Sequence, residues 1–143
     1  MQLTLYTDYS LRVLVYLAVA GRNVTVSEVA ERYGISRNHL VKVAHHLGKL
    51  GYVHTERGRN GGLRLARPAE AINLGQVVRD TEPNFNLVEC VDLAENQCVL
   101  APACQLKRVL AEAQRAFLAT IDQYTLADVA GNAAKLRALL GVA

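Results

Sequence analysis

Apolar and polar positions between residues 25 and 50 repeat with the period of two short helices. Thr25 precedes Glu28 by three residues, which is the spacing of a capping box, and the first helix is expected to end near Gly34. Ser36 can cap the second helix. One face of this helix carries Leu40, Val43, Ala44, Leu47 and Leu50, and the opposite face carries Asn38, Lys42, His45 and Lys49. The pattern predicts a helix-turn-helix with a basic, amide-bearing recognition helix.

A two-stranded hairpin is expected directly after this pair of helices. Residues 52–55 and 63–65 are typical of its strands, and Asn60-Gly61-Gly62 supplies turn positions that accept a positive φ. Such a hairpin is a β-wing. A wing that follows a helix-turn-helix indicates a winged-helix DNA-binding domain far more specifically than either part alone.

The carboxy-terminal half is expected to be helical. Residues 72–82 predict a helix that stops before Pro83, followed by a loop. A long amphipathic helix then carries a heptad-like seam of Leu106, Leu110, Ala113, Phe117, Ile121 and Tyr124. The simplest way to bury this seam is to pack it against the same helix of a second subunit. The alternative is that the seam packs within its own subunit. A last short helix is broken near Gly131.

The predicted fold is mainly α with a small β-wing, in one chain of 143 residues. We expect a winged helix-turn-helix at residues 1–80, a cysteine loop at 81–104, and a dimerisation helix with a carboxy-terminal helix at 105–143. The amino terminus has neither a cationic opening nor an 18-residue apolar run, so a cytoplasmic protein with no membrane partner is expected.

The net charge of +3 is unevenly distributed. Residues 34–67 hold seven Lys or Arg and one acid, whereas residues 68–143 hold six basic and nine acidic residues. This pattern is typical of a local polyanion-binding surface, and a solvated basic face is the equal alternative. Arg and Lys neutralise phosphates, and the first turn of a recognition helix reaches base edges. The DNA-binding candidates are Ser36, Arg37, Asn38, His39, Lys42, Arg57, Arg59, Asn60 and Arg64.

All three cysteines lie in one short stretch, as Cys90, Cys98 and Cys104. Their odd number excludes complete internal pairing, and their C-x7-C-x5-C spacing is a standard pattern neither for zinc nor for ferredoxin clusters. Burial, a redox pair with one spare thiol, zinc and an iron–sulfur cluster all stay open at this point. No histidine lies in or beside the stretch, and no phosphate or dinucleotide motif is present, so an enzyme is not expected.

Nearly the whole chain resembles a family of iron–sulfur winged-helix repressors that includes IscR-like and NsrR-like regulators. The resemblance rests on MQLTLYTDYSLRVLVYLA, VSEVAERYGISRNHLVKV and GYVHTERGRNGGLRLARP. It is closest to the NsrR-like branch of nitric-oxide sensors in VVRDTEPNFNLVEC and QYTLADV. The resemblance implies that Cys90, Cys98 and Cys104 bind a 4Fe–4S cluster, with 2Fe–2S as the alternative.

The resemblance also implies a fourth ligand. In IscR-like proteins a histidine three residues after the third cysteine completes the site, but Lys107 stands there in this chain, and an ammonium group has no lone pair for iron. NsrR-like proteins instead use an aspartate near the start of the first helix, from the opposite subunit. That position is Asp8 here, and Arg12 one turn later would offset part of the cluster's negative charge. Without the resemblance, Asp8 is best interpreted as a helix N-cap.

The function implied is a homodimeric transcriptional repressor that binds a palindromic operator and responds to nitric oxide. Nitrosylation of the cluster would lift repression. The alternative is a regulator of the same fold that senses cluster status or redox state through 2Fe–2S, zinc or a thiol switch.

Overall fold

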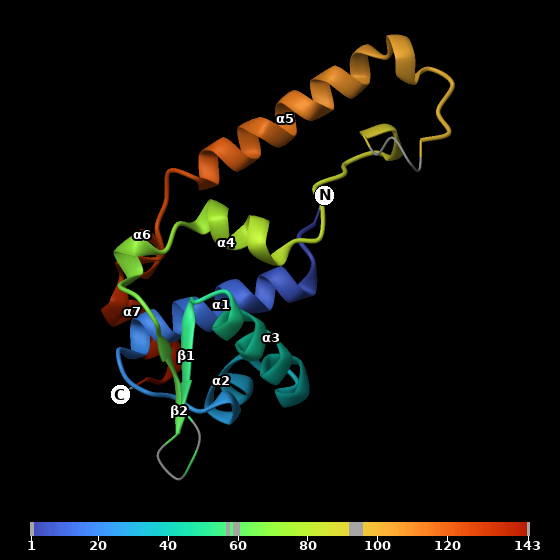
Figure 1. Cartoon of the computed structure of the whole chain (residues 1–143). Helices are drawn as coiled ribbons and strands as arrows, with labels where there is room; N and C mark the ends of the chain where they lie inside the picture. Colours follow the sequence, from blue (N-terminus) through green and yellow to red (C-terminus); the bar gives the residue numbers. More distant parts are fainter. Residues whose placement is uncertain (1, 57, 59–60, 92–95, 143) are drawn as a thin grey trace.

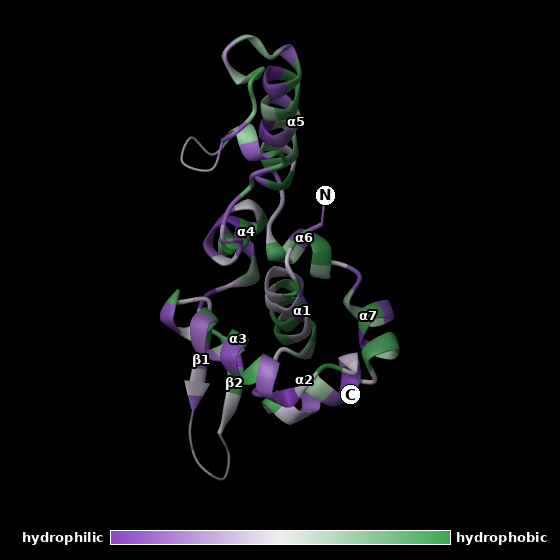
Figure 2. Ribbon diagram, turned by 90° about the vertical axis from the view of Figure 1, so that its right-hand side faces the viewer, coloured by the Kyte–Doolittle hydropathy of each residue, from purple (hydrophilic) through white to green (hydrophobic). Residues whose placement is uncertain are grey.

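Helix α1 (Leu5–Ala20) is the central element of the computed structural model, which describes residues 2–56, 58, 61–91 and 96–142. Figure 2 shows α1 surrounded by α2, α3, α4, α6 and α7. The helix is apolar on several sides, as expected of a buried helix. Its fully buried side chains include Val13, Leu14, Tyr16, Leu17 and Val19. Thr4 caps it, and Gly21 ends it with a left-handed φ of 62°.

The predicted helix-turn-helix is present as α2 (Val26–Tyr33) and α3 (Arg37–Lys49). Thr25 caps α2 by accepting from the Glu28 N–H at 3.0 Å. The predicted capping box is only half formed, because the Glu28 carboxylate accepts instead from Arg22 at 2.7 Å and from the Tyr16 hydroxyl at 2.9 Å. The predicted face of α3 is buried at Leu40, Val43, Ala44 and Leu47. Asn38, Lys42, His45 and Lys49 are exposed, as predicted.

The wing consists of antiparallel strands β1 (Val53–Glu56) and β2 (Gly62–Leu65), with Val53 opposite Leu65. The positive φ was expected at residues 60–62, but Gly62 is already the first residue of β2, and Gly58 has a φ of 112°. Gly62 is needed for another reason. A Cβ at this position would lie 2.8 Å from the Val24 carbonyl oxygen, so only glycine permits this close approach.

A long excursion leaves the core after α4 (Leu74–Thr81) and returns through α5 (Gln105–Ile121). We call residues 83–121 the cysteine arm; Figure 1 shows it projecting beyond α4. Its described residues include the 3₁₀ turns η2 (Glu89–Val91) and η3 (Ala101–Ala103), and another such turn, η1 (Ala69–Ala71), precedes α4. No residue of α5 is fully buried, and Leu106 and Val109 are 62% and 55% exposed.

The chain then returns to the core through α6 (Leu126–Ala130) and α7 (Ala133–Leu140), which flank Gly131 as predicted. Leu126 is fully buried in the same core as α1. The return point is fixed to α4, because Arg79 donates to Asp122 at 2.7 Å and the Asn73 amide donates to the Asp122 carbonyl, also at 2.7 Å. The boundaries 1–80, 81–104 and 105–143 stay a prediction, although α6 and α7 share the core of the first segment. Among the described helices, none has the length and apolarity that a bilayer-spanning helix requires.

Candidate functional site

The exposed face of α3 carries most of the residues predicted to contact DNA. Ser36 stands at the N-cap position of α3, but its hydroxyl makes no capping hydrogen bond and is exposed. The Arg37 guanidinium donates to the Ser27 hydroxyl at 3.0 Å, which holds its stem against α2. Asn38 and Lys42 follow on the same exposed surface. The first two turns of α3 therefore present hydroxyl, amide and cationic groups to solvent.

Two aromatic contacts join α3 to α1. The His39 ring stacks on Tyr9 with ring centroids 6.4 Å apart, and the His46 ring lies 5.6 Å from Tyr6. His39 is an exposed DNA-binding candidate, so one side of its ring is supported by α1. These contacts fix the orientation of the recognition helix relative to the first turns of α1, which also contain Asp8.

The wing places Arg64 on β2, opposite His54 on β1. Glu56 lies 3.5 Å from the Arg64 guanidinium and 3.7 Å from the His54 ring. The other wing candidates, Arg57, Arg59 and Asn60, lie outside the described residues. A hollow of about 360 Å³ separates the wing from α2 and α3, and its lining includes Ser27, Arg37, His45 and Thr55. Apolar side chains such as Val41 and Leu63 and the acidic Glu56 line the same hollow, so this concave surface between recognition helix and wing is mixed in character.

The base of the wing is tied to α4 through Tyr52. Its hydroxyl donates to the Asp80 carboxylate at 2.5 Å, and the Arg67 guanidinium lies 4.5 Å above its ring. Burial, together with the hydrogen bond to Asp80, raises the pKa of Tyr52. The phenol therefore stays protonated and keeps donating at neutral pH.

The three cysteines all lie in the cysteine arm, and all are free thiols. Cys90 is buried within η2, Cys98 is half-buried, and half-buried Cys104 immediately precedes α5. Over residues 2–56, 58, 61–91 and 96–142, no three His, Cys, Asp or Glu side chains are grouped as a metal site. The structure thus places the three predicted thiolate ligands on one arm, without gathering them around a common point, and places Asp8 on α1.

Asp8 lies in the first turn of α1 and pairs with Arg12 one turn later. The Asp8 carboxylate accepts from Arg12 at 2.8 Å and 3.0 Å, and this hydrogen bond raises the pKa of the guanidinium. Both side chains are partly exposed, at 36% for Asp8 and 45% for Arg12. The alternative interpretation of Asp8 as the N-cap is wrong, because Thr4 has that role and the Asp8 N–H donates to the Thr4 carbonyl. The Asp8 carboxylate is therefore not used in capping.

Glu82 was not singled out from the sequence. Its carboxylate accepts hydrogen bonds from the Thr4 N–H, the Thr4 hydroxyl and the Thr7 hydroxyl. The sequence contains one signal for it: an acidic residue at the carboxy-terminal end of a helix faces the negative end of the helix dipole, which is unfavourable without a compensating partner. Thr4 and Thr7 provide this compensation by donating hydrogen bonds to the Glu82 carboxylate.

Comparison with known proteins identifies close relatives. Residues 3–132 match the model of the Rrf2 family, described as iron-dependent transcriptional regulators. The HTH-type transcriptional regulator NsrR of Bacillus licheniformis is 54% identical over 142 residues, which cover 98% of this chain and 99% of the relative. The regulator of the same name from Bacillus subtilis is also 54% identical, covering 98% and 97%. The resemblance to NsrR-like proteins is confirmed.

Solved structures confirm the fold. CymR, the global cysteine regulator of B. subtilis, superposes with a TM-score of 0.75 at 24% identity over 92% of this chain and 97% of CymR. IscR of T. potens superposes with a TM-score of 0.73, also at 24% identity, over 93% and 88%. The expectation that the chain is not an enzyme agrees with relatives that are named transcriptional regulators. From its helix-turn-helix, its wing and its sequence relatives, the chain belongs to the Rrf2 family of transcriptional regulators.

Proposed function

We propose that this chain is a homodimeric repressor whose DNA binding is controlled by a 4Fe–4S cluster that reacts with nitric oxide. The observation that carries the proposal is the position of the cysteines: all three are free, and all lie on the arm between α4 and α5. The arm projects from the core that holds the recognition helix (Figure 1). A change at the arm would then reach α3 through the contacts that join the described part of the arm to the core.

DNA is held, in this proposal, by the first turns of α3 and by the wing. Arg37, Lys42 and Arg64 neutralise phosphates, while Ser36, Asn38 and His39 face the groove. The proposal extends to the wing residues Arg57, Arg59 and Asn60, which lie outside the described residues. A two-fold dimer places one recognition helix in each half-site of a palindromic operator.

Replacing Lys42 with alanine should weaken binding about tenfold to a duplex selected in vitro with the wild-type protein, because a charge-assisted contact to phosphate is lost. The slope of log affinity against log salt should become shallower by about one for each phosphate contact removed. Lys135→Ala, which removes the same charge from the exposed surface of α7, is the matched control. Equal losses for the two variants would place Lys42 outside the DNA interface.

The donor set fits an iron–sulfur cluster in its chemistry. Thiolates are the usual ligands of these clusters, and the chain supplies three that are not oxidised to a disulfide. Lys107 in the first turn of α5 has no lone pair to offer, so the fourth ligand must come from elsewhere. We assign it to Asp8 of the other subunit, whose carboxylate is partly exposed and free of capping contacts. Arg12 then remains beside the carboxylate and offsets negative charge.

The dimer is proposed to form through the seam of α5. This helix has no fully buried residue in the single chain, although Leu106, Leu110, Phe117 and Ile121 repeat at helical spacing. A second copy of the same helix would remove these side chains from water, and the proposed ligand set requires that the two-fold axis place Asp8 of one subunit near the arm of the other.

The cluster supplies iron that nitric oxide can attack, and a carboxylate is a weaker ligand for such a soft site than a thiolate. Loss of ligation would free the cysteine arm and the Asp8 turn of α1. Because Tyr6 and Tyr9 support His46 and His39 of the recognition helix, movement of this turn shifts α3. The two recognition helices of the dimer then lose the spacing of the operator, and repression ends.

The proposal is tested by reconstituting the full chain without oxygen. Iron and sulfide are each expected at about four per chain, and stepwise addition of nitric oxide should release the selected duplex in parallel with loss of the cluster spectrum. A duplex affinity that changes neither when the cluster is removed nor when nitric oxide is added would overturn the proposal. Bound metal without sulfide would indicate zinc, and a response to thiol oxidants without iron would indicate a thiol switch.

A further inference from the structure

The side chain of Glu82 joins two segments that lie far apart in the sequence. It stands at the end of α4, immediately before the cysteine arm begins at Pro83. Its carboxylate accepts from the Thr4 N–H at 3.2 Å, the Thr4 hydroxyl at 3.0 Å and the Thr7 hydroxyl at 2.5 Å. A helix C-terminus is thereby fastened to the N-terminus of another helix, α1, across 78 positions of sequence.

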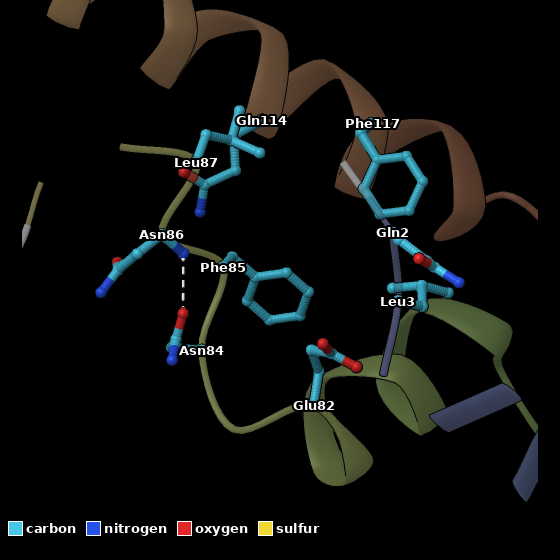
Figure 3. A pocket seen from close by; sticks show the side chains of 9 residues that line it. All are labelled: Gln2, Leu3, Glu82, Asn84, Phe85, Asn86, Leu87, Gln114 and Phe117. Atoms are coloured by element: carbon cyan, nitrogen blue, oxygen red, sulfur yellow. Dashed lines mark hydrogen bonds between the residues drawn. The ribbon is translucent and has the colours of Figure 1, made fainter. Parts of the chain in front are cut away.

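These hydrogen bonds lie at the edge of a hollow between the cysteine arm and the amino-terminal segment. A hollow of about 470 Å³ separates Gln2 and Leu3 from the arm residues Phe85, Leu87 and Phe117. Glu82 also lines this hollow, and Figure 3 shows its carboxylate between the Phe85 ring and the amino-terminal segment, away from the Phe117 ring. The root of the arm therefore meets the start of α1 through polar contacts at Glu82, on one side of an open space.

We propose that Glu82 is a positioning residue that couples the cysteine arm to the Asp8 turn of α1. Thr7 is fully buried and is the neighbour of Asp8, and the Asp8 N–H donates to the carbonyl of Thr4, the other partner of Glu82. A shift of the arm at its root pulls on both threonines and moves the turn that carries Asp8. Hydrogen bonds to a carboxylate are stronger than neutral ones, which suits them to transmitting such a movement.

This inference rests on the proposed function for its wider consequence. If Asp8 binds the cluster of the other subunit, Glu82 connects each subunit's own cysteines to the site that its partner uses. The two cluster sites of the dimer are then energetically coupled through the Glu82 side chains of both subunits. Loss of one cluster lowers the stability of the second, so the dimer responds to the signal as one unit.

The test compares two buried threonines in the full-length chain. Thr7→Val removes the hydroxyl that donates to Glu82 and keeps the shape of the side chain. Thr81→Val is the matched control, because the buried Thr81 hydroxyl donates only within α4, to the Val77 carbonyl at 2.8 Å. Thr7→Ser restores the donor, and Glu82→Gln provides a second disruption if Thr7→Val does not fold.

In cluster-free protein, Thr7→Val should speed amide hydrogen exchange about tenfold both in the first turn of α1 and at residues 84–91 of the arm. Thr81→Val and Thr7→Ser should change neither region by more than about twofold. Faster exchange in α1 alone would make Glu82 a simple helix cap and overturn the coupling.

In reconstituted protein, Thr7→Val should leave the cluster spectrum unchanged and lower the ratio of duplex affinity with and without cluster by about tenfold. A variant that keeps the wild-type ratio would also overturn the coupling. If instead the wild-type protein shows no dependence of affinity on the cluster, the proposed function fails, while the exchange experiment still decides the role of Glu82.

Discussion

We expect Cys98→Ala to be isolated without an iron–sulfur cluster and to bind the selected duplex no better than the cluster-free wild-type protein. The change removes one of three thiolates, leaving too few strong ligands to hold the cluster. Outer-shell substitutions typically reduce metal affinity by roughly 10- to 100-fold, and the loss of a direct ligand should exceed this range. Iron and sulfide per chain, together with the visible spectrum, are the measurements.

Neighbouring Val99 provides the control for Cys98→Ala. Its side chain is 90% exposed, so Val99→Ala trims a residue of similar size in the same loop without removing a thiol. This variant should retain full iron and sulfide. A Cys98→Ala protein that also retains both would remove Cys98 from the ligand set.

The proposed carboxylate ligand should behave differently from the thiolate. Asp8→Ala keeps all three thiols, so the cluster should still assemble, with an altered spectrum and altered reactivity towards nitric oxide. Arg12→Ala is the informative comparison, because it breaks the same ion pair and leaves the carboxylate in place. If the two variants have identical spectra, the effect of Asp8 lies in the ion pair and not in ligation.

Leu110→Glu is expected to convert the dimer into monomers. Truncating or charging a central contact of an interface typically costs 2 kcal/mol or more, and two-fold symmetry applies the cost twice. A total of about 4 kcal/mol weakens association by roughly a thousandfold. Sedimentation velocity measures the change directly, and affinity for a palindromic duplex should fall with it because the two half-sites are no longer bound together.

Ala119→Glu is the matched variant for this experiment. Position 119 follows Leu110 by nine residues, which places it half a turn around α5 on an exposed surface. The same charge there should leave the dimer intact. A Leu110→Glu protein that still sediments as a dimer would show that the subunits associate through another surface.

Local patterns predicted the DNA-binding half of the fold well. The apolar spacing of α3 depends only on residues within two turns of one another, and Leu40, Val43, Ala44 and Leu47 are all buried. The wing followed from a glycine-rich turn between two alternating segments. The break between α6 and α7 followed from Gly131.

Features that depend on distant partners were not predictable in the same way. Asp8 and Thr4 are both suitable caps for α1, and Thr4 has that role in a cluster of hydrogen bonds with Glu82 from the far end of α4. Glu28 has the spacing of a capping box, but Arg22 and Tyr16 bind its carboxylate. The cysteine site is a more extreme case, because its proposed fourth ligand lies in another chain.

The ion pair between Arg79 and Asp122 has a consequence for how proteins of this kind diverge. The chain leaves the core just after α4 and returns to α4 at Asp122, so the whole cysteine arm begins and ends at one helix. An insertion or deletion in the loop before α5 leaves both attachment points on α4 in place, and doubling a flexible loop costs only about 0.6 kcal/mol in closure entropy. The interval between Cys90 and Cys98 lies inside this segment. Selection can therefore retune the sensor by changing loop length while the surface that reads DNA is inherited unchanged.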